Sequence, residues 1–327
     1  MSLIYGPLPS WRFGRSLGVD ATTLPKKCSY SCIYCQLGRT ELYVSQPESI
    51  QSQLPTPSQI REALEKYLES VELDSIDIVT ISGTGEPTLN LSLSEIVDNI
   101  RSVIGGKPLG ILTNASLIPR EDVFNALLKF DFVSAKFDAG DEKAYRIINR
   151  PCKGLPSFEE IKNSIKQLVH RCKGVVALET MLLRTSRGFS NIEGEHYQSL
   201  IENILDIKPH IVQLYTPWRP AAEDYVQQAT AAEIQKAAAD LAVKLGREKL
   251  WVYGEHDERG KRVKWKSIVN AEKTITELLK RRPCRISDIT FDLNLPLGVV
   301  VESLKRLQEE NKLESRKVDG EVFYNIK

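Results

Sequence analysis

Short apolar stretches rich in β-branched residues alternate with longer amphipathic stretches between Ser16 and His256. This alternation is typical of repeated βα units around a parallel sheet, and about six units are predicted. Strands are predicted at 16–22, 76–82, 109–114, 132–138, 175–183 and 211–216, with a further strand from Leu250, and helices at 58–70, 93–104, 120–129, 158–171, 195–205 and 230–245. Because a parallel barrel collects the ends of its strands on one rim, we expect the reactive side chains there.

The pattern changes after His256. Five basic residues fall in the eight positions from Arg259 to Lys266, which predicts a basic linker at 257–267. Beyond it, helices are predicted at 268–281, 285–293 and 296–310, and strands at 313–318 and 321–327, with Asp319 and Gly320 as a hairpin turn. The sequence therefore predicts a larger domain at 1–256 and a small winged helix-turn-helix domain at 268–327.

Charge and composition narrow the class of protein. The 327 residues include 44 Lys or Arg and 43 Asp or Glu, so a net charge of +1 provides no overall field that attracts nucleic acid. The 42% of hydrophobic residues excludes disordered and fibrous classes. No apolar run approaches the ~20 residues of a membrane span, and the N-terminus lacks the apolar core of a secretory signal. We expect a cytoplasmic protein with no membrane partner.

Three cysteines, Cys28, Cys32 and Cys35, lie just after the first predicted strand. A C-x3-C-x2-C spacing on a loop can bring three thiolates to one metal assembly. No Cys or His follows within the next twenty residues, so a tetrahedral structural zinc site would be incomplete. Three cysteines are sufficient for a 4Fe-4S cluster whose fourth iron binds an external chelating ligand. A zinc site completed by a remote histidine and metal-free reduced cysteines are the alternatives.

The motif CSYSCIYC, with Tyr34 at its aromatic position, resembles the cluster loop of the radical S-adenosylmethionine (radical SAM) superfamily. Further matching segments are SGTGEPTLN at 82–90, LTN at 112–114, AKFDAGDE at 135–142 and VQLYTPWRP at 212–220. Over residues 4–256 the chain is similar to a subgroup called wyosine-synthase-like or metallocofactor-biosynthesis-like.

This resemblance implies a partial (βα)6 barrel of the TIM type that carries a 4Fe-4S cluster. It also implies an enzyme that reductively cleaves S-adenosylmethionine (SAM) to a 5′-deoxyadenosyl radical. An electron donor such as ferredoxin or flavodoxin would be its partner.

The resemblance also assigns residues to SAM. Gly83, Thr84, Gly85 and Glu86 match the family's G-G-E-P motif, which implies that backbone carbonyls and Glu86 receive the methionine ammonium. Thr84 separates two glycines that are usually adjacent in the family.

Polar residues at the ends of other strands are further candidates. Asn114, Lys136 and Asp138 follow the third and fourth predicted strands, where the ribose hydroxyls and the methionine carboxylate would lie. Gln213 would meet the adenine edge, and Tyr34 would stack on its face. Rim salt bridges and helix capping are the alternative roles for these side chains.

Four arginines fall in segments that match the subgroup, and together they could form an anionic substrate pocket: Arg12, Arg15, Arg150 and Arg219. Solvated surface arginines are the alternative. The isolated cysteines Cys152, Cys172 and Cys284 are expected to be buried thiols, and for Cys152 a position facing the substrate is the alternative.

Three functions are compatible with these residues. The first is a radical SAM enzyme whose substrate is a modified RNA base, and the second is a radical maturase of a protein or metallocofactor. The third is a non-enzymatic iron-sulfur redox sensor whose winged helix binds DNA. The tail at 271–327 carries eleven basic and ten acidic residues, which is weak for a DNA-binding domain, and winged helices also dock proteins.

Overall fold

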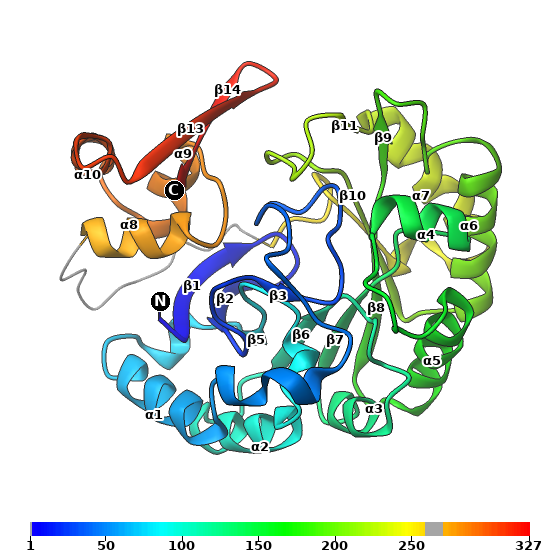
Figure 1. The fold of residues 1–327 in the computed structure, drawn as a ribbon, viewed down its shortest axis with the longest axis horizontal. Helices are drawn as coiled ribbons and strands as arrows, with labels where there is room; N and C mark the ends of the chain where they lie inside the picture. The colour runs from blue at the N-terminus through cyan, green and yellow to red at the C-terminus, as the bar shows by residue number, and fades with distance from the viewer. Residues whose placement is uncertain (1, 259–270) are drawn as a thin grey trace.

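A curled eight-stranded sheet with helices along its outer side forms the larger part of the molecule (Figure 1). The strand order is β1-β2-β5-β6-β7-β8-β10-β12, with every neighbouring pair parallel except β1 and β2. This computed structural model describes residues 2–258 and 271–327. The predicted basic linker from residue 259 onward, and the first three residues of the helix predicted at 268–281, lie outside the described residues.

The strands of this sheet are short. They are β1 (Ile4–Ser10), β2 (Gly14–Val19), β5 (Ile78–Ile81), β6 (Leu109–Thr113), β7 (Phe132–Lys136), β8 (Val175–Met181), β10 (Ile211–Tyr215) and β12 (Leu250–Val252). Three two-stranded sheets accompany it: β3 (Lys27–Cys28) with β4 (Leu42–Tyr43), β9 (Leu183–Thr185) with β11 (Val226–Gln228), and β13 (Leu313–Val318) with β14 (Glu321–Ile326).

The helices follow the strands in alternation. They are α1 (Pro57–Leu68), α2 (Leu93–Val103), α3 (Glu121–Leu127), α4 (Glu142–Ile148), α5 (Phe158–Arg171), α6 (Gly194–Ile207), α7 (Ala231–Leu245), α8 (Ala271–Leu279), α9 (Ile286–Leu293) and α10 (Leu297–Glu309). Short 3₁₀ helices lie at Pro47–Gln53, Leu73–Ser75, Pro87–Leu89 and Arg247–Lys249. None of the described helices combines the length and apolarity needed to cross a membrane.

Capping residues explain where several of these helices begin. The side chains of Thr56, Ser157 and Thr230 accept the backbone N–H of the third residue of α1, α5 and α7. The Gln or Glu side chain at that third position accepts the backbone N–H of the capping residue. Such capping boxes satisfy donors that the helix itself cannot. Apolar residues at helical spacing, such as Ile161, Ile165 and Leu168 on α5, then bury one face against the sheet.

The predicted βα pattern is confirmed, and the differences from it include one strand, one helix and one divided strand. Strand β1 was not predicted because Gly6, Pro7 and Pro9 interrupt its apolar pattern, yet it pairs antiparallel with β2. Helix α4, at Glu142–Ile148, was also not predicted. The strand predicted at 175–183 is two strands, because the chain leaves the large sheet after Met181 and continues as β9.

The C-terminal segment has its own hydrophobic core, formed by α8, α9, α10 and the β13–β14 sheet. Leu8 of β1 packs against this core. The three helices and the hairpin correspond to the predicted elements, and the winged helix-turn-helix assignment stays a prediction. In Figure 1 this segment lies beside β1, at the edge of the large sheet.

Polar contacts also join the C-terminal segment to the barrel. Arg281 donates to the carbonyl of Ser2 at 2.5 Å and lies 4.2 Å from the centre of the Tyr5 ring. On the other side of the segment, Arg316 donates to the carbonyl of Ala221 at 3.0 Å. The segment therefore contacts both the first strand and the loop that follows β10.

Candidate active site

The cysteine loop, which carries Cys28, Cys32 and Cys35, contacts residues at the carboxyl ends of β6 and β7. Backbone hydrogen bonds hold it there. The N–H of Ile33 donates to Ile148 O at 2.9 Å, and the N–H of Glu223 donates to Ile33 O at 3.0 Å. Tyr30 forms a bridge with Pro151. Ile33 is fully buried. The end of α4 and the loop after β10 therefore bind the centre of the cysteine loop through its backbone.

Each of the three cysteine sulfurs accepts one hydrogen bond from a side-chain nitrogen. Asn114 Nδ2 lies 3.4 Å from Cys28 Sγ, and Asn149 Nδ2 lies 3.6 Å from Cys32 Sγ. Lys26 Nζ lies 3.2 Å from Cys35 Sγ. Donors that reach all three sulfurs stabilise thiolates, which is the form in which cysteine binds a metal.

Burial shapes the protonation of these thiols. It raises the pKa of Cys28, and it raises the pKa of Cys32 to about 11, helped by the charge of Cys35. Burial alone would lower the pKa of the Lys26 ammonium, but the three sulfurs raise it overall. Cys28 and Cys32 would therefore release protons as a metal assembly binds.

The donor set fits an iron-sulfur cluster better than a single ion. All six cysteines are free thiols. Within 2–258 and 271–327, no three His, Cys, Asp or Glu side chains converge closely enough to hold one metal ion. The ligands of a cluster can lie farther apart than those of a single ion, because each cysteine binds a different iron. Cys28, Cys32 and Cys35 would be those ligands.

The Gly83–Glu86 loop packs directly against the start of the cysteine loop. A Cβ atom on Gly85 would lie 2.0 Å from the carbonyl oxygen of Lys27, and a Cβ on Gly83 would lie 2.3 Å from Cγ of Asp20. The N–H of Glu86 donates to the same Lys27 oxygen at 3.0 Å. Glycine is required at position 85 because the two backbones approach too closely for a side chain, and at position 83 because the buried Asp20 carboxylate fills the space.

Asp20, which the sequence did not single out, connects these loops. Its fully buried carboxylate accepts hydrogen bonds from the N–H and hydroxyl of Thr22 and from the N–H of Thr23. It also accepts from the N–H of Thr84 at 3.2 Å and from its hydroxyl at 2.9 Å. Thr84, the residue that departs from the family motif, is thus fixed by Asp20.

Glu86 joins the Gly83–Glu86 loop to β6. Its buried carboxylate accepts the hydroxyl of Thr113 at 2.6 Å, the N–H of Asn114 at 2.6 Å, and both donors of Thr88. Burial raises its pKa, although these hydrogen bonds oppose the shift. The contact with Asn114 matters for the cysteine loop, since the side chain of that residue donates to Cys28 Sγ and to Ser29 Oγ.

Tyr34, Lys136 and Asp138 lie together. The Tyr34 hydroxyl donates to Asp138 Oδ2, which also accepts Asn149 Nδ2 at 3.0 Å. Lys136 Nζ lies 4.8 Å from the centre of the Tyr34 ring and 3.9 Å from Asp138 Oδ1. The hydroxyl of Tyr34 is therefore bound to the carboxylate that the sequence assigned to the ribose.

Gln213 lies deeper in the barrel. Its side-chain oxygen accepts hydrogen bonds from Arg12 Nε and Ser134 Oγ, each at 3.0 Å, while Nε2 is buried and has no partner within residues 2–258 and 271–327. Beside it, Glu179 forms ion pairs with Arg12 at 2.5 Å and Lys136 at 3.4 Å. Burial alone would raise the pKa of Glu179, but the charges of Arg12 and Lys136 lower this pKa to about 2.

The four arginines of the predicted anionic pocket contact different partners. Arg12 pairs with Glu179, Arg15 with Asp77, and Arg150 with Glu223. Arg219 lies against the Trp218 ring and donates to Gln36 at 3.4 Å. Cys152 is half-buried, and its N–H donates to Ser29 O at 2.9 Å beside the cysteine loop.

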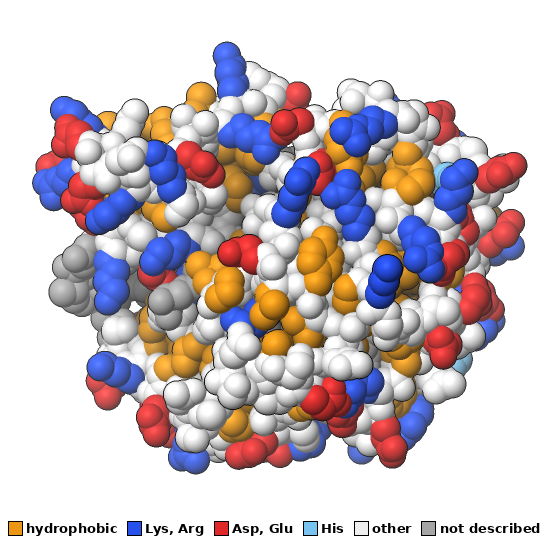
Figure 2. Space-filling view, in the orientation of Figure 1, with side chains coloured by type: hydrophobic (Ala, Val, Ile, Leu, Met, Phe, Trp, Pro, Cys, Tyr) orange, Lys and Arg blue, Asp and Glu red, His pale blue; other side chains and the backbone are white. Residues whose placement is uncertain are grey.

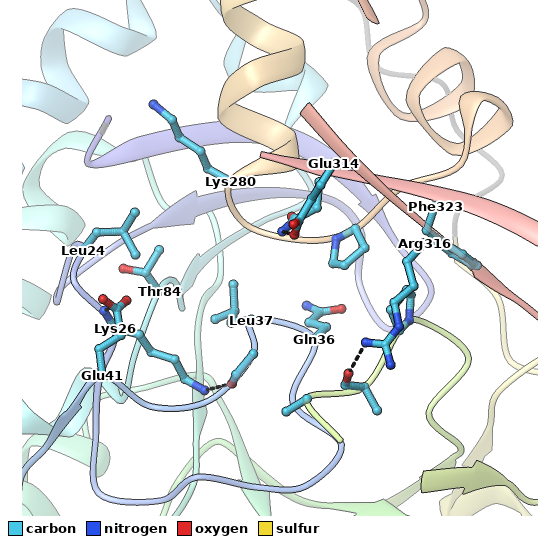
Figure 3. A pocket seen from close by; sticks show the side chains of 16 residues that line it. Leu24, Lys26, Gln36, Leu37, Glu41, Thr84, Lys280, Glu314, Arg316 and Phe323 are labelled. Carbon is cyan, nitrogen blue, oxygen red and sulfur yellow. Dashed lines mark hydrogen bonds between the residues drawn. The ribbon is translucent and has the colours of Figure 1, made fainter. Parts of the chain in front are cut away.

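A cavity of about 320 Å³ separates the cysteine loop from the C-terminal segment (Figure 3). Lys26, Leu37 and Thr84 line it from the barrel, whereas Glu314 and Arg316 of β13 line it from the opposite side. Figure 2 shows the molecule in the orientation of Figure 1. Hydrophobic side chains lie at the centre of the face toward the viewer, and Lys and Arg side chains lie around the upper part of that face.

Several residues of the site escaped the sequence analysis. Asn149 and Glu179 contact the site from positions far along the chain, and no local spacing indicates these partners. Lys26 lies two residues before Cys28 in the motif KKC, and a lysine beside a metal loop was the available signal.

Comparison with known proteins identifies the family. Residues 23–186 match the radical SAM superfamily. A UPF0026 protein of Methanocaldococcus jannaschii is 33% identical over 329 aligned residues, which cover 100% of this chain and 97% of that protein. A UPF0026 protein of Synechocystis is 36% identical over 66% of this chain and 76% of its own length.

A solved structure shares the fold. The crystal structure of Streptococcus suis SuiB bound to S-adenosylmethionine superposes with a TM-score of 0.50 at 14% identity, over 73% of this chain and 50% of SuiB. The partial barrel predicted from the sequence is thereby confirmed. This chain belongs to the radical SAM superfamily of enzymes, and within it to the UPF0026 family.

Proposed function

We propose that this enzyme holds a 4Fe-4S cluster on Cys28, Cys32 and Cys35 and binds SAM beside it. The observation that carries the proposal is the set of side-chain donors, one to each sulfur, on a loop packed against the Gly83–Glu86 loop. SuiB, which shares the fold, was crystallised with SAM. When bound, the cluster would supply the electron that cleaves SAM to methionine and a 5′-deoxyadenosyl radical.

The residues of the chain would bind and orient the two groups. Asn114, Asn149 and Lys26 would hold the sulfurs in place, and Asp20 would keep the Gly83–Glu86 loop against the cysteine loop. The carbonyls of that loop are the proposed acceptors for the methionine ammonium. Because Glu86 already accepts four internal hydrogen bonds, its main task would be to fix Asn114.

Asp138, Lys136 and Tyr34 are the proposed contacts for the ribose and the carboxylate of SAM. Their mutual contacts would have to open or be shared when SAM binds, since the Tyr34 hydroxyl already occupies one Asp138 oxygen. Gln213 would reach the adenine through Nε2, the one buried side-chain donor of the barrel interior that lacks a partner among the described residues.

An anaerobic assay tests the proposal. Reconstituted protein should contain four iron atoms per chain, and dithionite with SAM should yield 5′-deoxyadenosine. Replacing any of Cys28, Cys32 or Cys35 by alanine should abolish the product, while Cys152→Ala, which removes a neighbouring thiol outside the loop, should retain the cluster. A protein that binds iron and yields no 5′-deoxyadenosine would be the iron-sulfur sensor.

The substrate is proposed to be an RNA base or a protein that contacts the C-terminal segment. The exposed side chains at the start of α10 include Leu297, Val299 and Val301, so this surface is apolar rather than basic. Apolar exposed patches favour a protein partner. RNA that copurifies with the full chain but not with a chain lacking 271–327 would contradict the protein alternative.

A further inference from the structure

Lys26 is a buried lysine whose ammonium group points at the cysteine loop. The residue is 4% exposed. Its Nζ donates to Cys35 Sγ at 3.2 Å and to the carbonyl oxygen of Gly38 at 2.6 Å, a contact drawn in Figure 3. Among the described residues, no Asp or Glu forms an ion pair with this ammonium, and Glu41 accepts only its backbone N–H. The charge of Lys26 is therefore directed at sulfur.

The three sulfurs differ in the charge of their donors. Cys28 and Cys32 accept hydrogen bonds from the neutral amides of Asn114 and Asn149, whereas Cys35 accepts one from a cation. Charge in a buried position is weakly screened by water, and hydrogen bonds to cysteine sulfur tune the reduction potential of iron-sulfur clusters. A cation on one sulfur stabilises the reduced cluster, which carries one more negative charge.

We propose that Lys26 is a positioning residue that raises the reduction potential of the cluster by holding its positive charge against Cys35. The inference rests on the proposed function, because it requires a cluster on the three cysteines. The reaction concerned is the one-electron reduction of that cluster by an external reductant, with no bond made or broken in the protein.

The neighbouring lysine provides a matched control. Lys27 is also buried, at 1% exposed, but its Nζ faces the carbonyl oxygens of Thr22, Thr23 and Pro25 at 3.4 to 3.5 Å. Lys27→Met thus removes the same charge from the same segment without touching a sulfur donor.

The experiment is a redox titration of the full-length, reconstituted protein, followed by electron paramagnetic resonance (EPR). Lys26→Met and Lys26→Gln should shift the midpoint to more negative potential by at least about 59 mV, a tenfold change in the one-electron equilibrium. Lys26→Arg keeps the cation and should stay near the wild-type value, as should Lys27→Met. Lys26→Gln separates charge from hydrogen bonding, since its amide still donates.

Three results would overturn the inference. The first is a wild-type midpoint in both Lys26→Met and Lys26→Gln, and the second is an equal shift in Lys27→Met. The third is loss of iron from both neutral variants of Lys26, which would make the residue a requirement for cluster assembly. Absence of four iron atoms from the wild-type protein would instead refute the proposed function, so the two failures are distinguishable.

Discussion

Replacing Gly85 by alanine tests the contact between the two loops of the site. The added Cβ would lie 2.0 Å from the Lys27 carbonyl oxygen and 3.1 Å from its carbon. Both are backbone atoms, so the clash cannot be relieved by turning a side chain. The Gly83–Glu86 loop has to move away from the cysteine loop, and the hydrogen bond from the Glu86 N–H to the same oxygen, now 3.0 Å, is lost.

The expected loss of stability follows from these two effects. Overpacking a closely packed position costs about 1–3 kcal/mol, and a lost backbone hydrogen bond costs about 1 kcal/mol. Alanine reduces the conformational freedom of the unfolded chain, which offsets at most about 1 kcal/mol. Gly85→Ala should therefore lower the free energy of unfolding by about 1–4 kcal/mol.

Urea denaturation of the purified protein measures this loss, with Gly298→Ala as the control. A Cβ on Gly298 meets no atom within 4 Å, and the residue lies inside α10. That variant should be as stable as wild type or up to about 1 kcal/mol more stable, because alanine favours helix. An unfolding free energy of Gly85→Ala equal to that of wild type would refute the close approach of the two loops.

Two further predictions concern carboxylates. Although partial burial raises it, hydrogen bonds from Ser2, Lys280 and Arg281 lower the pKa of Glu277 to about 2, from a usual 4.5. The stability that the ionised Glu277 contributes is present above pH 4.5 and is lost toward pH 2. Glu277→Gln should therefore have a lower free energy of unfolding than wild type at pH 7, and a difference between the two that does not change with pH would contradict this. Glu179→Gln leaves two half-buried cations without their carboxylate and should cost about 3 kcal/mol in urea denaturation, whereas a loss below about 1 kcal/mol would show that the fold does not depend on these ion pairs.

The βα alternation could be predicted because it depends on local spacing. The helix predicted at 158–171 has the same bounds in the structure, since Ser157 and Glu160 mark its start and apolar residues repeat at helical intervals. Strand β1 could not be predicted, because its pairing with β2 overrides a sequence broken by two prolines.

In the candidate site, too, local features could be predicted from the sequence, whereas long-range contacts could not. The three cysteines are close in sequence, and their spacing indicates the chemistry. Asp20 and Thr84 lie 64 positions apart, and Arg12 and Glu179 lie 167 apart, so their hydrogen bonds depend on how the barrel closes. Local sequence carries no information on such pairs. The partners of Tyr34 and Gln213 were hidden for the same reason, which is why their predicted contacts with SAM stay predictions.

The central claim is that three thiolates hold a cluster with one iron free to bind SAM. The most direct test is the EPR spectrum of dithionite-reduced protein, recorded before and after SAM is added. The account predicts a cluster signal that changes shape with SAM and that is absent from Cys32→Ala. A signal that SAM leaves unaltered, or one that persists in Cys32→Ala, would contradict it.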